Sequence, residues 1–187
     1  MANNKIKYGI RNCYYAPRTE STTTSGTYSY GAPVAIPGAV SISLAPEGES
    51  TSFYADDIEY FRAEANNGYS GDLVVAILPD AFRQYALGET KGTDNVLYED
   101  ADAFGGEFAL GFEIQGNDHN TLFWFYNCVA SRPETAANTK ESSIEPETDT
   151  VTIACRPDED HIVRGKTTDD TATTVTTAWF TAVHKEA

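Results

Sequence analysis

Short stretches in which apolar and polar residues alternate recur along the chain, separated by clusters of Gly, Pro, Asn and Asp. Three of them occupy residues 39–44, 107–114 and 150–156. Because successive side chains of a strand point to opposite faces, each stretch predicts a half-buried β-strand with one polar side. The positions expected on the apolar sides are Val40, Ile42 and Leu44; Phe108, Leu110, Phe112 and Ile114; and Val151, Ile153 and Cys155.

Two further runs are apolar on both faces, residues 73–78 (LVVAIL) and 122–129 (LFWFYNCV). This pattern is typical of central strands that are covered on each side. Between residues 58–65 and 69–78 stands Asn66-Asn67-Gly68. Asn-Gly readily supplies the positive φ angles of a tight turn, so we expect a hairpin at this point.

A single helix is expected just after the first of these runs. Pro79 suits a first helical turn, Gly88 suits a helix end, and the apolar residues between them recur at helical spacing. One short helix among many strands predicts a mainly β (β-dominated α+β) fold, an antiparallel β-sandwich or partial barrel with one short flanking helix. At 187 residues, a single domain spanning residues 1–187 is the simplest organisation.

Two long segments, residues 16–33 and 131–149, show no strand or helix pattern and are expected to be loops. Loops of this length in a compact domain are either surface segments without fixed structure or segments that become ordered against a partner. In the first segment Tyr28 and Tyr30 flank Ser29, and alternating tyrosines are better suited to an interface than to solvent. This favours contact with a neighbouring subunit.

Charge and cysteine content narrow the possible functions. Thirteen Lys and Arg stand against 28 Asp and Glu, which gives a formal net charge of -15. Nucleic-acid binding relies on cations, so this surplus argues against it, although a weakly repelling surface suits DNA that only passes nearby. Lys5 and Lys7 precede no apolar run, so we expect folding in the cytoplasm without a signal or membrane span. The widely spaced Cys13, Cys128 and Cys155 suggest reduced, buried thiols.

Motifs of enzyme chemistry are missing from the sequence. No phosphate-binding Gly loop, zinc-type Cys pair, His-Glu-x-x-His helix or nucleophile elbow occurs, so we expect no catalytic residue, metal or cofactor. The acidic run 158–160 before His161 lacks the ligand spacing of a cation site and is interpreted as a solvated hairpin tip. Asp118-His119 follows a Gly-Asn pair and is interpreted as a turn.

Two other features admit a functional and a structural interpretation. Asp56-Asp57 resembles the paired carboxylates of a glycosidase only superficially, because those come from separate elements, and a turn is the better interpretation. Trp124 and its aromatic neighbours could line a sugar-binding face, but an unbroken apolar strand favours core packing.

Several segments that are not chemical motifs follow one another along nearly the whole chain. They are residues 8–16, 36–44, 46–49, 53–57, 66–71, 77–80, 82–83, 126–128, 130–133, 143–148, 166–170 and 179–182. In this order the segments resemble the major tail proteins, or tail tube proteins, of long-tailed, non-contractile phages that infect Gram-positive bacteria.

The resemblance implies a non-enzymatic structural subunit of the virion. Hexameric rings of such subunits stack into a hollow tube around a tape-measure protein, bounded by tail terminator and distal tail proteins, and genomic DNA passes through without specific binding. Strands of all six subunits join an inner barrel, which removes exposed strand edges. The resemblance makes Thr27, Tyr28, Ser29 and Tyr30 candidates for contact with another subunit or ring, and Glu59, Glu64 and Asp72 candidates for the lumen.

Two alternatives remain open at this point. A phage-associated β-sandwich module that binds carbohydrate or protein would need exposed aromatic side chains. A hydrolase with an unrecognised site would need two acidic groups with separated pKa values in one cleft.

Overall fold

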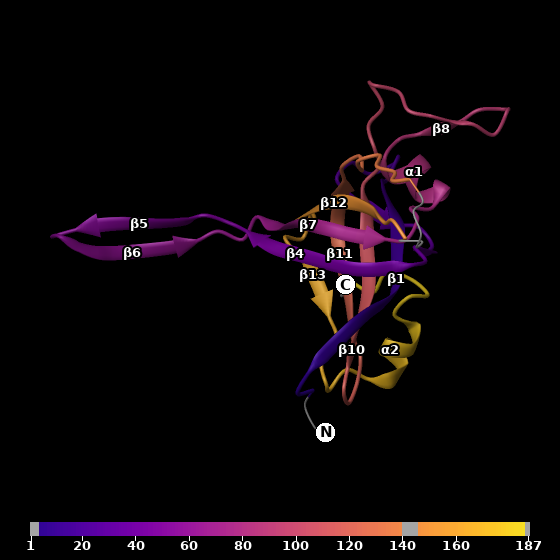
Figure 1. Ribbon diagram of the computed structural model, residues 1–187. Coiled ribbons are helices and arrows are strands. Elements are labelled where there is room, and N and C mark those ends of the chain that lie inside the picture. The colour runs from indigo at the N-terminus through magenta and orange to yellow at the C-terminus, as the bar shows by residue number, and fades with distance from the viewer. Residues whose placement is uncertain (1–3, 140–145, 186–187) are drawn as a thin grey trace.

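The computed structural model describes residues 4–139 and 146–185, and its main feature is one antiparallel β-sheet of nine strands (Figure 1). These strands are β1 (Lys7–Glu20), β2 (Tyr28–Tyr30), β3 (Val34–Ala35), β4 (Ala39–Glu47), β7 (Gly68–Val75), β10 (Phe108–Gly116), β11 (Thr121–Ala130), β12 (Asp149–Arg156) and β13 (Arg164–Lys166). Seven of them lie in the order β2-β1-β10-β11-β12-β7-β4, while β3 pairs with β1 and β13 with β11. The mainly β, antiparallel fold expected from the alternating pattern is confirmed.

Two hairpins stand apart from the sheet (Figure 1). One consists of β5 (Ser50–Ala55) and β6 (Ile58–Glu64), and the other of β8 (Thr90–Lys91) and β9 (Leu97–Tyr98). The helices of the described residues are α1 (Asp80–Ala86) and α2 (Thr173–Ala178). The first hairpin joins β4 to β7, so these four strands form one long ribbon.

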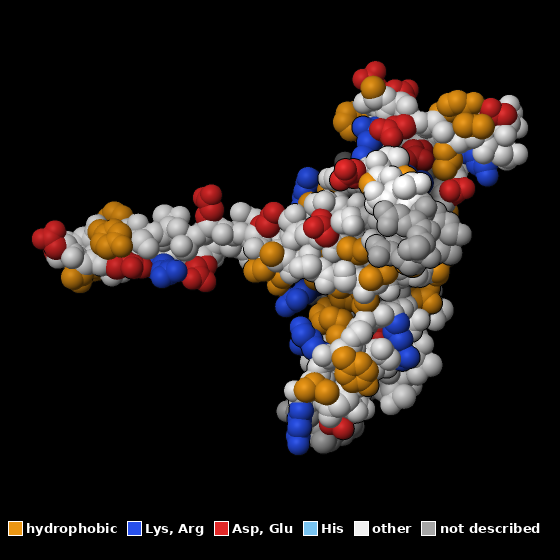
Figure 2. Space-filling view, in the orientation of Figure 1, with side chains coloured by type: hydrophobic (Ala, Val, Ile, Leu, Met, Phe, Trp, Pro, Cys, Tyr) orange, Lys and Arg blue, Asp and Glu red, His pale blue; other side chains and the backbone are white. Residues whose placement is uncertain are grey.

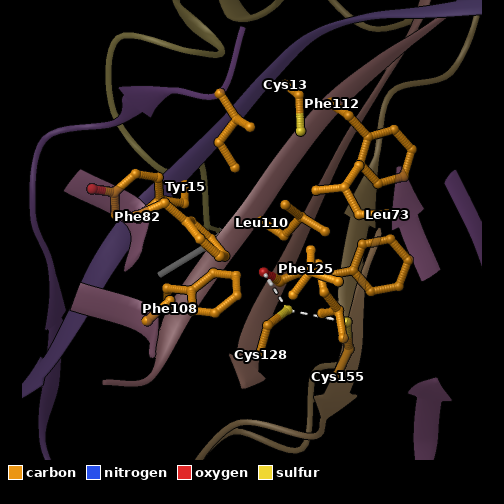
Figure 3. Close-up of a cluster of buried hydrophobic side chains, with 14 of the residues drawn as sticks. Cys13, Tyr15, Leu73, Phe82, Phe108, Leu110, Phe112, Phe125, Cys128 and Cys155 are labelled. Carbon is orange, nitrogen blue, oxygen red and sulfur yellow. Dashed lines mark hydrogen bonds between the residues drawn. The ribbon is translucent and has the colours of Figure 1, made fainter. Parts of the chain in front are cut away.

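The sheet folds over on itself, so that β4 at one edge contacts β1 and the ribbon of β4 and β7 crosses β10 and β11 (Figure 1). The main core fills the space enclosed in this way (Figure 3). Helix α1 closes one end of it, where the ring of Phe82 packs edge-on against Phe108 and Tyr15, with centroid distances of 5.3 and 5.2 Å. Pro79 as the N-cap of α1 and the positive φ of Gly88 just past its end confirm the helix expected there.

A second buried cluster covers the outer face of β1, β10 and β11. It contains Trp124 and Trp179, and the indole Nε1–H of Trp124 donates to the carbonyl oxygen of Trp179 at 3.0 Å. Val175 of α2 and Phe180 pack against it from outside. These central strands are therefore buried on both faces, which confirms the interpretation of residues 122–129 and the core role of Trp124.

The predicted alternation of buried and exposed residues is confirmed in β12, is wrong in β10 and holds only in part of β4. In β12, Val151 and Ile153 are buried while Thr150 and Thr152 are exposed, as expected. In β10 the predicted polar side is wrong, because Ala109, Gly111 and Glu113 are as buried as their neighbours. In β4, Ile42 and Leu44 are half-buried but Val40 is 54% exposed, because the register with β7 shifts between Ala39 and Ser41.

The unexpected burial in β10 follows from the second helix, which the sequence did not predict. Its residues, TTVTTA, include four threonines, and a β-branched side chain loses rotamer freedom in a helix. The run 73–78 also ends earlier than expected. Strand β7 stops at Val75 and Ile77 is 76% exposed, because the Leu78 amide turns to donate to Asp149 Oδ2 at 2.7 Å.

The hairpin expected at Asn66-Asn67-Gly68 is wrong. The chain reverses instead at Asp56-Asp57, between β5 and β6, which confirms the turn interpretation of those two residues. Residues 66–68 lead straight on into β7, where Gly68 pairs with Glu47 and the Asn67 amide donates to the Glu47 carbonyl at 2.8 Å. Gly68 has a φ of +116°, but this positive φ lies within the ribbon and does not reverse the chain.

The loop prediction is partly wrong for residues 16–33 and is confirmed for the described part of residues 131–148. In residues 16–33 the expectation is wrong for residues 16–20, which belong to β1, and for 28–30, which form β2 and pair with β1. The mixed composition of these residues gives no alternating pattern, because the polar Arg18 is buried while Thr19 and Glu20 are exposed. In residues 131–149 the described part, 131–139 and 146–148, has no helix or strand, β12 begins at Asp149, and residues 140–145 lie outside the described residues.

Candidate assembly interface

The hairpin of residues 50–64, here called the arm, extends away from the rest of the molecule (Figure 1). Phe53 pairs with Phe61 and Ala55 with Ile58. The turn residues Asp56 and Asp57 have φ angles of 51° and 60°. A two-residue hairpin turn with positive φ at both positions matches the right-handed twist of its strands, and aspartate tolerates this conformation better than most residues.

Large apolar side chains of the arm are exposed to solvent (Figure 2). In the part of the chain that the structure describes, β5 and β6 pair only with each other. A lone two-stranded hairpin is at best marginally stable in water, and a gathering of exposed aromatic residues marks a contact surface. The exposed fractions are 59% for Phe53, 64% for Tyr54, 62% for Ile58, 73% for Tyr60 and 58% for Phe61.

The arm is also acidic. It carries four carboxylates, Asp56, Asp57, Glu59 and Glu64, against one guanidinium, Arg62. The Arg62–Glu64 pair spans 3.5 Å with both side chains exposed, so it contributes little to stability. The arm therefore presents apolar surface within a negative field.

Two of the three acids expected at a lumen, Glu59 and Glu64, lie on the arm, in β6. The third, Asp72, lies on β7 and accepts a hydrogen bond from Thr152 Oγ1 at 2.7 Å. The structure thus places all three on one continuous ribbon. Their orientation toward a lumen stays a prediction.

A groove lies at the end of the folded sheet away from α1. Along β10, Phe108 packs on α1, whereas Phe112 and Ile114 reach this other end. The groove, of about 330 Å³, is here called the basic groove and is lined by Lys7, Ile42, Ser43, Leu44, Tyr69, Phe112, Ile114, Phe123, Phe125 and Arg164. Phe112 stacks on Phe123 at its floor, with ring centroids 5.0 Å apart.

Both charged residues of this lining are cations. Lys7 and Arg164 are exposed, and within residues 4–139 and 146–185 neither has an ion-pair partner. The Arg164 guanidinium lies 4.9 Å from the centre of the Tyr69 ring. In a chain with more than twice as many acids as bases, an apolar groove bordered by cations alone is an unusual surface.

The second hairpin provides another apolar projection. Val96 and Tyr98 are about half exposed, and Phe104, in the segment that returns to the sheet, is 94% exposed. Arg132 steadies the base of this projection through an ion pair with Glu99 at 2.8 Å and a hydrogen bond to the Asp100 carbonyl at 2.9 Å.

The residues expected to contact another subunit, Thr27, Tyr28, Ser29 and Tyr30, lie against this subunit's own β1. The Arg18 guanidinium lies 3.5 Å from the centre of the Tyr28 ring, and the Thr27 carbonyl accepts from the Ser21 amide at 2.7 Å. Burial raises the pKa of Tyr30 to about 12. Contact of this segment with a second copy stays a prediction.

The acidic run 158–160 enters a turn in which Asp160 and His161 are exposed, as expected, but the expectation is wrong for Asp158. Asp158 is buried, and Lys185 Nζ lies 2.8 Å from its Oδ2 and 2.6 Å from Asp160 Oδ2. Burial alone would lower the pKa of Lys185, but the hydrogen bonds that it donates to Asp158 and Asp160 outweigh this effect and raise that pKa. The sequence did not reveal this pairing because the cation stands 25 residues from Asp160 along the chain.

A cleft of about 730 Å³ lies beside α2 and is lined mainly by threonines, asparagines and acids. His119 is in the β10–β11 turn, as expected, and its Nε2 lies 2.5 Å from Asp169 Oδ1. Glu113 accepts hydrogen bonds from Arg11 and Asn12, and Thr167 Oγ1 accepts from the Leu122 amide at 2.9 Å. These polar groups already serve the fold, and no metal-binding cluster occurs among the residues described.

All three cysteines are free and buried, which confirms that expectation. Burial raises the pKa of the Cys13 thiol to about 12. The Cys128 thiol, 3.0 Å from the sulfur of Cys155, also has a raised pKa because of burial and its hydrogen bond to that residue (Figure 3).

No protein-family model matches the chain, and no curated protein matches it as a relative. Among the described helices, none has the length and apolar character needed to cross a bilayer. The arm is the feature that sequence reasoning missed. Its signal was present as a mirrored pattern, in which Phe53-Tyr54 and Tyr60-Phe61 flank Asp56-Asp57.

Proposed function

We propose that the protein is a structural subunit that acts as a polymer of its own copies, as the tail tube subunit of a long-tailed phage. The observation that carries this proposal is the arm, which exposes five large apolar side chains and has no support from the rest of the chain described. Side chains of this kind are stabilised when a partner covers them.

The shape of the molecule favours contacts between unlike surfaces of two copies. The extended stretch from Glu47 to the turn at Asp56 reaches about 30 Å at about 3.3 Å per residue. An arm of this length can reach a surface of the neighbouring copy other than that copy's arm. Such head-to-tail contacts generate closed rings, or helical filaments when the rotation does not close.

The resemblance to tail tube proteins adds the expected stoichiometry, hexameric rings stacked around a tape-measure protein in the virion. Each subunit would bring a net charge of -15 to such a ring. A bore with this charge repels phosphate, so genomic DNA would slide through without binding. Tail terminator and distal tail proteins would bound the tube. The binding-module alternative gains no support from Trp124 and Trp179, because both are buried.

The proposal is tested by Phe53→Ser with Phe61→Ser, the cross-strand pair of the arm. We expect the natural chain to form rings or tubes in negative-stain micrographs, and the double variant to remain monomeric by light scattering with an unchanged melting temperature. Ile77→Ser, at an exposed position outside the arm, is the matched control and should assemble normally. A natural chain that stays monomeric at every concentration and salt tried would overturn the proposal, as would normal assembly of the arm variant.

A further inference from the structure

We infer that the arm of one copy binds in the basic groove of a second copy. This inference rests on the proposed function, and it adds which surface receives the arm. It follows from the charges, the apolar lining and the separation of the two surfaces within one chain.

The charges of the two surfaces are opposite. The arm carries four carboxylates and one guanidinium, whereas the groove lining carries Lys7 and Arg164 and no carboxylate. Two copies that each carry -15 repel one another over most of their surfaces. The groove is a place where an acidic arm approaches another copy with attraction, and complementary charge of this kind selects the docking site.

The apolar side chains of the arm also match the groove in size. Phe53 and Phe61 are directly opposite on the two strands of the arm, so their rings share one face of it and can enter a groove together. A cavity of about 150 Å³ accommodates one benzene-sized ring, so the groove of about 330 Å³ has room for both. Phe123 is partly exposed at the groove and stacks on the buried Phe112, with ring centroids 5.0 Å apart, so it offers an aromatic surface to an incoming ring.

The arm cannot fill the groove of its own chain. Ile42, Leu44 and Tyr69 of the groove belong to the same ribbon from which the arm projects, and the arm points away from them (Figure 1). The ladder between β4 and β7 continues to the pair of Glu47 and Gly68 and so fixes the direction in which the arm leaves the sheet, away from the groove. The occupant is therefore another copy.

The test uses the full chain with Lys7→Glu and Arg164→Glu. The concentration needed for assembly should rise by about tenfold or more, because both rim charges then repel the arm. Lys91→Glu, at an exposed cation on the second hairpin, changes the net charge by the same amount as each single groove substitution, so it is the control for Lys7→Glu and for Arg164→Glu taken one at a time. Arg164→Lys with Lys7→Arg keeps the groove cationic. Both controls should assemble as the natural chain does.

A mixing experiment separates this inference from the proposed function. A chain with residues 50–64 replaced by a short Gly-Ser linker can only receive an arm, and the groove-reversed chain can only donate one. At the concentration at which the natural chain just assembles, neither should polymerise alone, and together they should form a 1:1 pair that grows no further, visible by light scattering. If the groove-reversed chain assembles like the natural one, the inference is wrong but self-assembly stands. If the natural chain never assembles, both are wrong.

Discussion

Replacing Arg18 by methionine removes a buried cation that joins three segments of the chain. Its side chain is 2% exposed, and its guanidinium pairs with Glu107, just before β10, and with Glu159 Oε2 at 2.5 Å. It also lies 3.5 Å from the centre of the Tyr28 ring in β2. Burial alone would lower the pKa of Arg18, but the hydrogen bond to Glu159 and the charges of both glutamates raise it.

The size of the effect follows from what methionine leaves behind. Breaking a buried ion pair by removing one partner costs about 3–5 kcal/mol. Here the stranded carboxylates are 38% and 27% exposed and regain water, while methionine retains most of the packing volume. We therefore expect a loss of about 2–3 kcal/mol in the free energy of unfolding. For a chain of this length the melting temperature should fall by roughly 5–10 °C.

Urea unfolding followed by tryptophan fluorescence measures this loss. Arg62→Met is the control, because Arg62 pairs with Glu64 at the exposed arm, and it should change the unfolding free energy by less than about 0.5 kcal/mol. A cycle with Glu159→Gln should show coupling of at least about 1 kcal/mol, as buried contacts do. If Arg18→Met matches the Arg62→Met control, or the cycle shows no coupling, Arg18 does not hold these segments together.

Four further outcomes follow from the structure. Gly68→Ala should destabilise the chain by at least about 2 kcal/mol in urea unfolding, because a Cβ there would lie 1.9 Å from the Cys155 carbonyl oxygen at a φ of +116°. Trp179→Ala should cost about 3–5 kcal/mol in the same assay, and a smaller loss would show that the outer cluster adds little. Ellman's reagent should find no reactive thiol in the native protein at pH 8 and three in denaturant. Because burial raises the pKa of the Cys13 thiol from 9.0 to about 12, its ionisation favours the unfolded chain above pH 9. The contribution of this thiol to stability should therefore fall as the pH rises from 9 toward 12, as measured by urea unfolding.

Local patterns predicted the elements whose environment is set by neighbouring residues. The alternation around Val151 and Ile153 and the Pro79 start of α1 needed no knowledge of distant segments. The predictions failed where a segment distant in the sequence determines whether a side chain is buried. The sequence pattern predicted a solvent-facing Glu113, but the segment after residue 166 covers this side chain in the fold. The pattern also predicted a solvated Asp158, but Lys185 pairs with it.

The site was harder to predict than the fold for a related reason. An exposed Phe53 or Phe61 has the same sequence signature as a buried one, because alternation shows which residues share a face and not whether that face is covered. The basic groove joins Lys7, Ile42 and Arg164 from strands far apart in the sequence. Its absence of carboxylates becomes visible only after the chain is folded.

The carboxylates of the arm restrict which surface the arm can bind. An apolar ribbon with free edges invites uncontrolled pairing with other ribbons. Four carboxylates on each arm make two arms repel, so arm-to-arm contact is disfavoured while an arm meeting Lys7 and Arg164 is not. Salt then has two opposing effects, since it screens repulsion between the acidic bodies and also weakens attraction at the groove rim. Assembly should therefore be greatest at intermediate ionic strength, whereas polymerisation driven by apolar contact alone would increase steadily with salt.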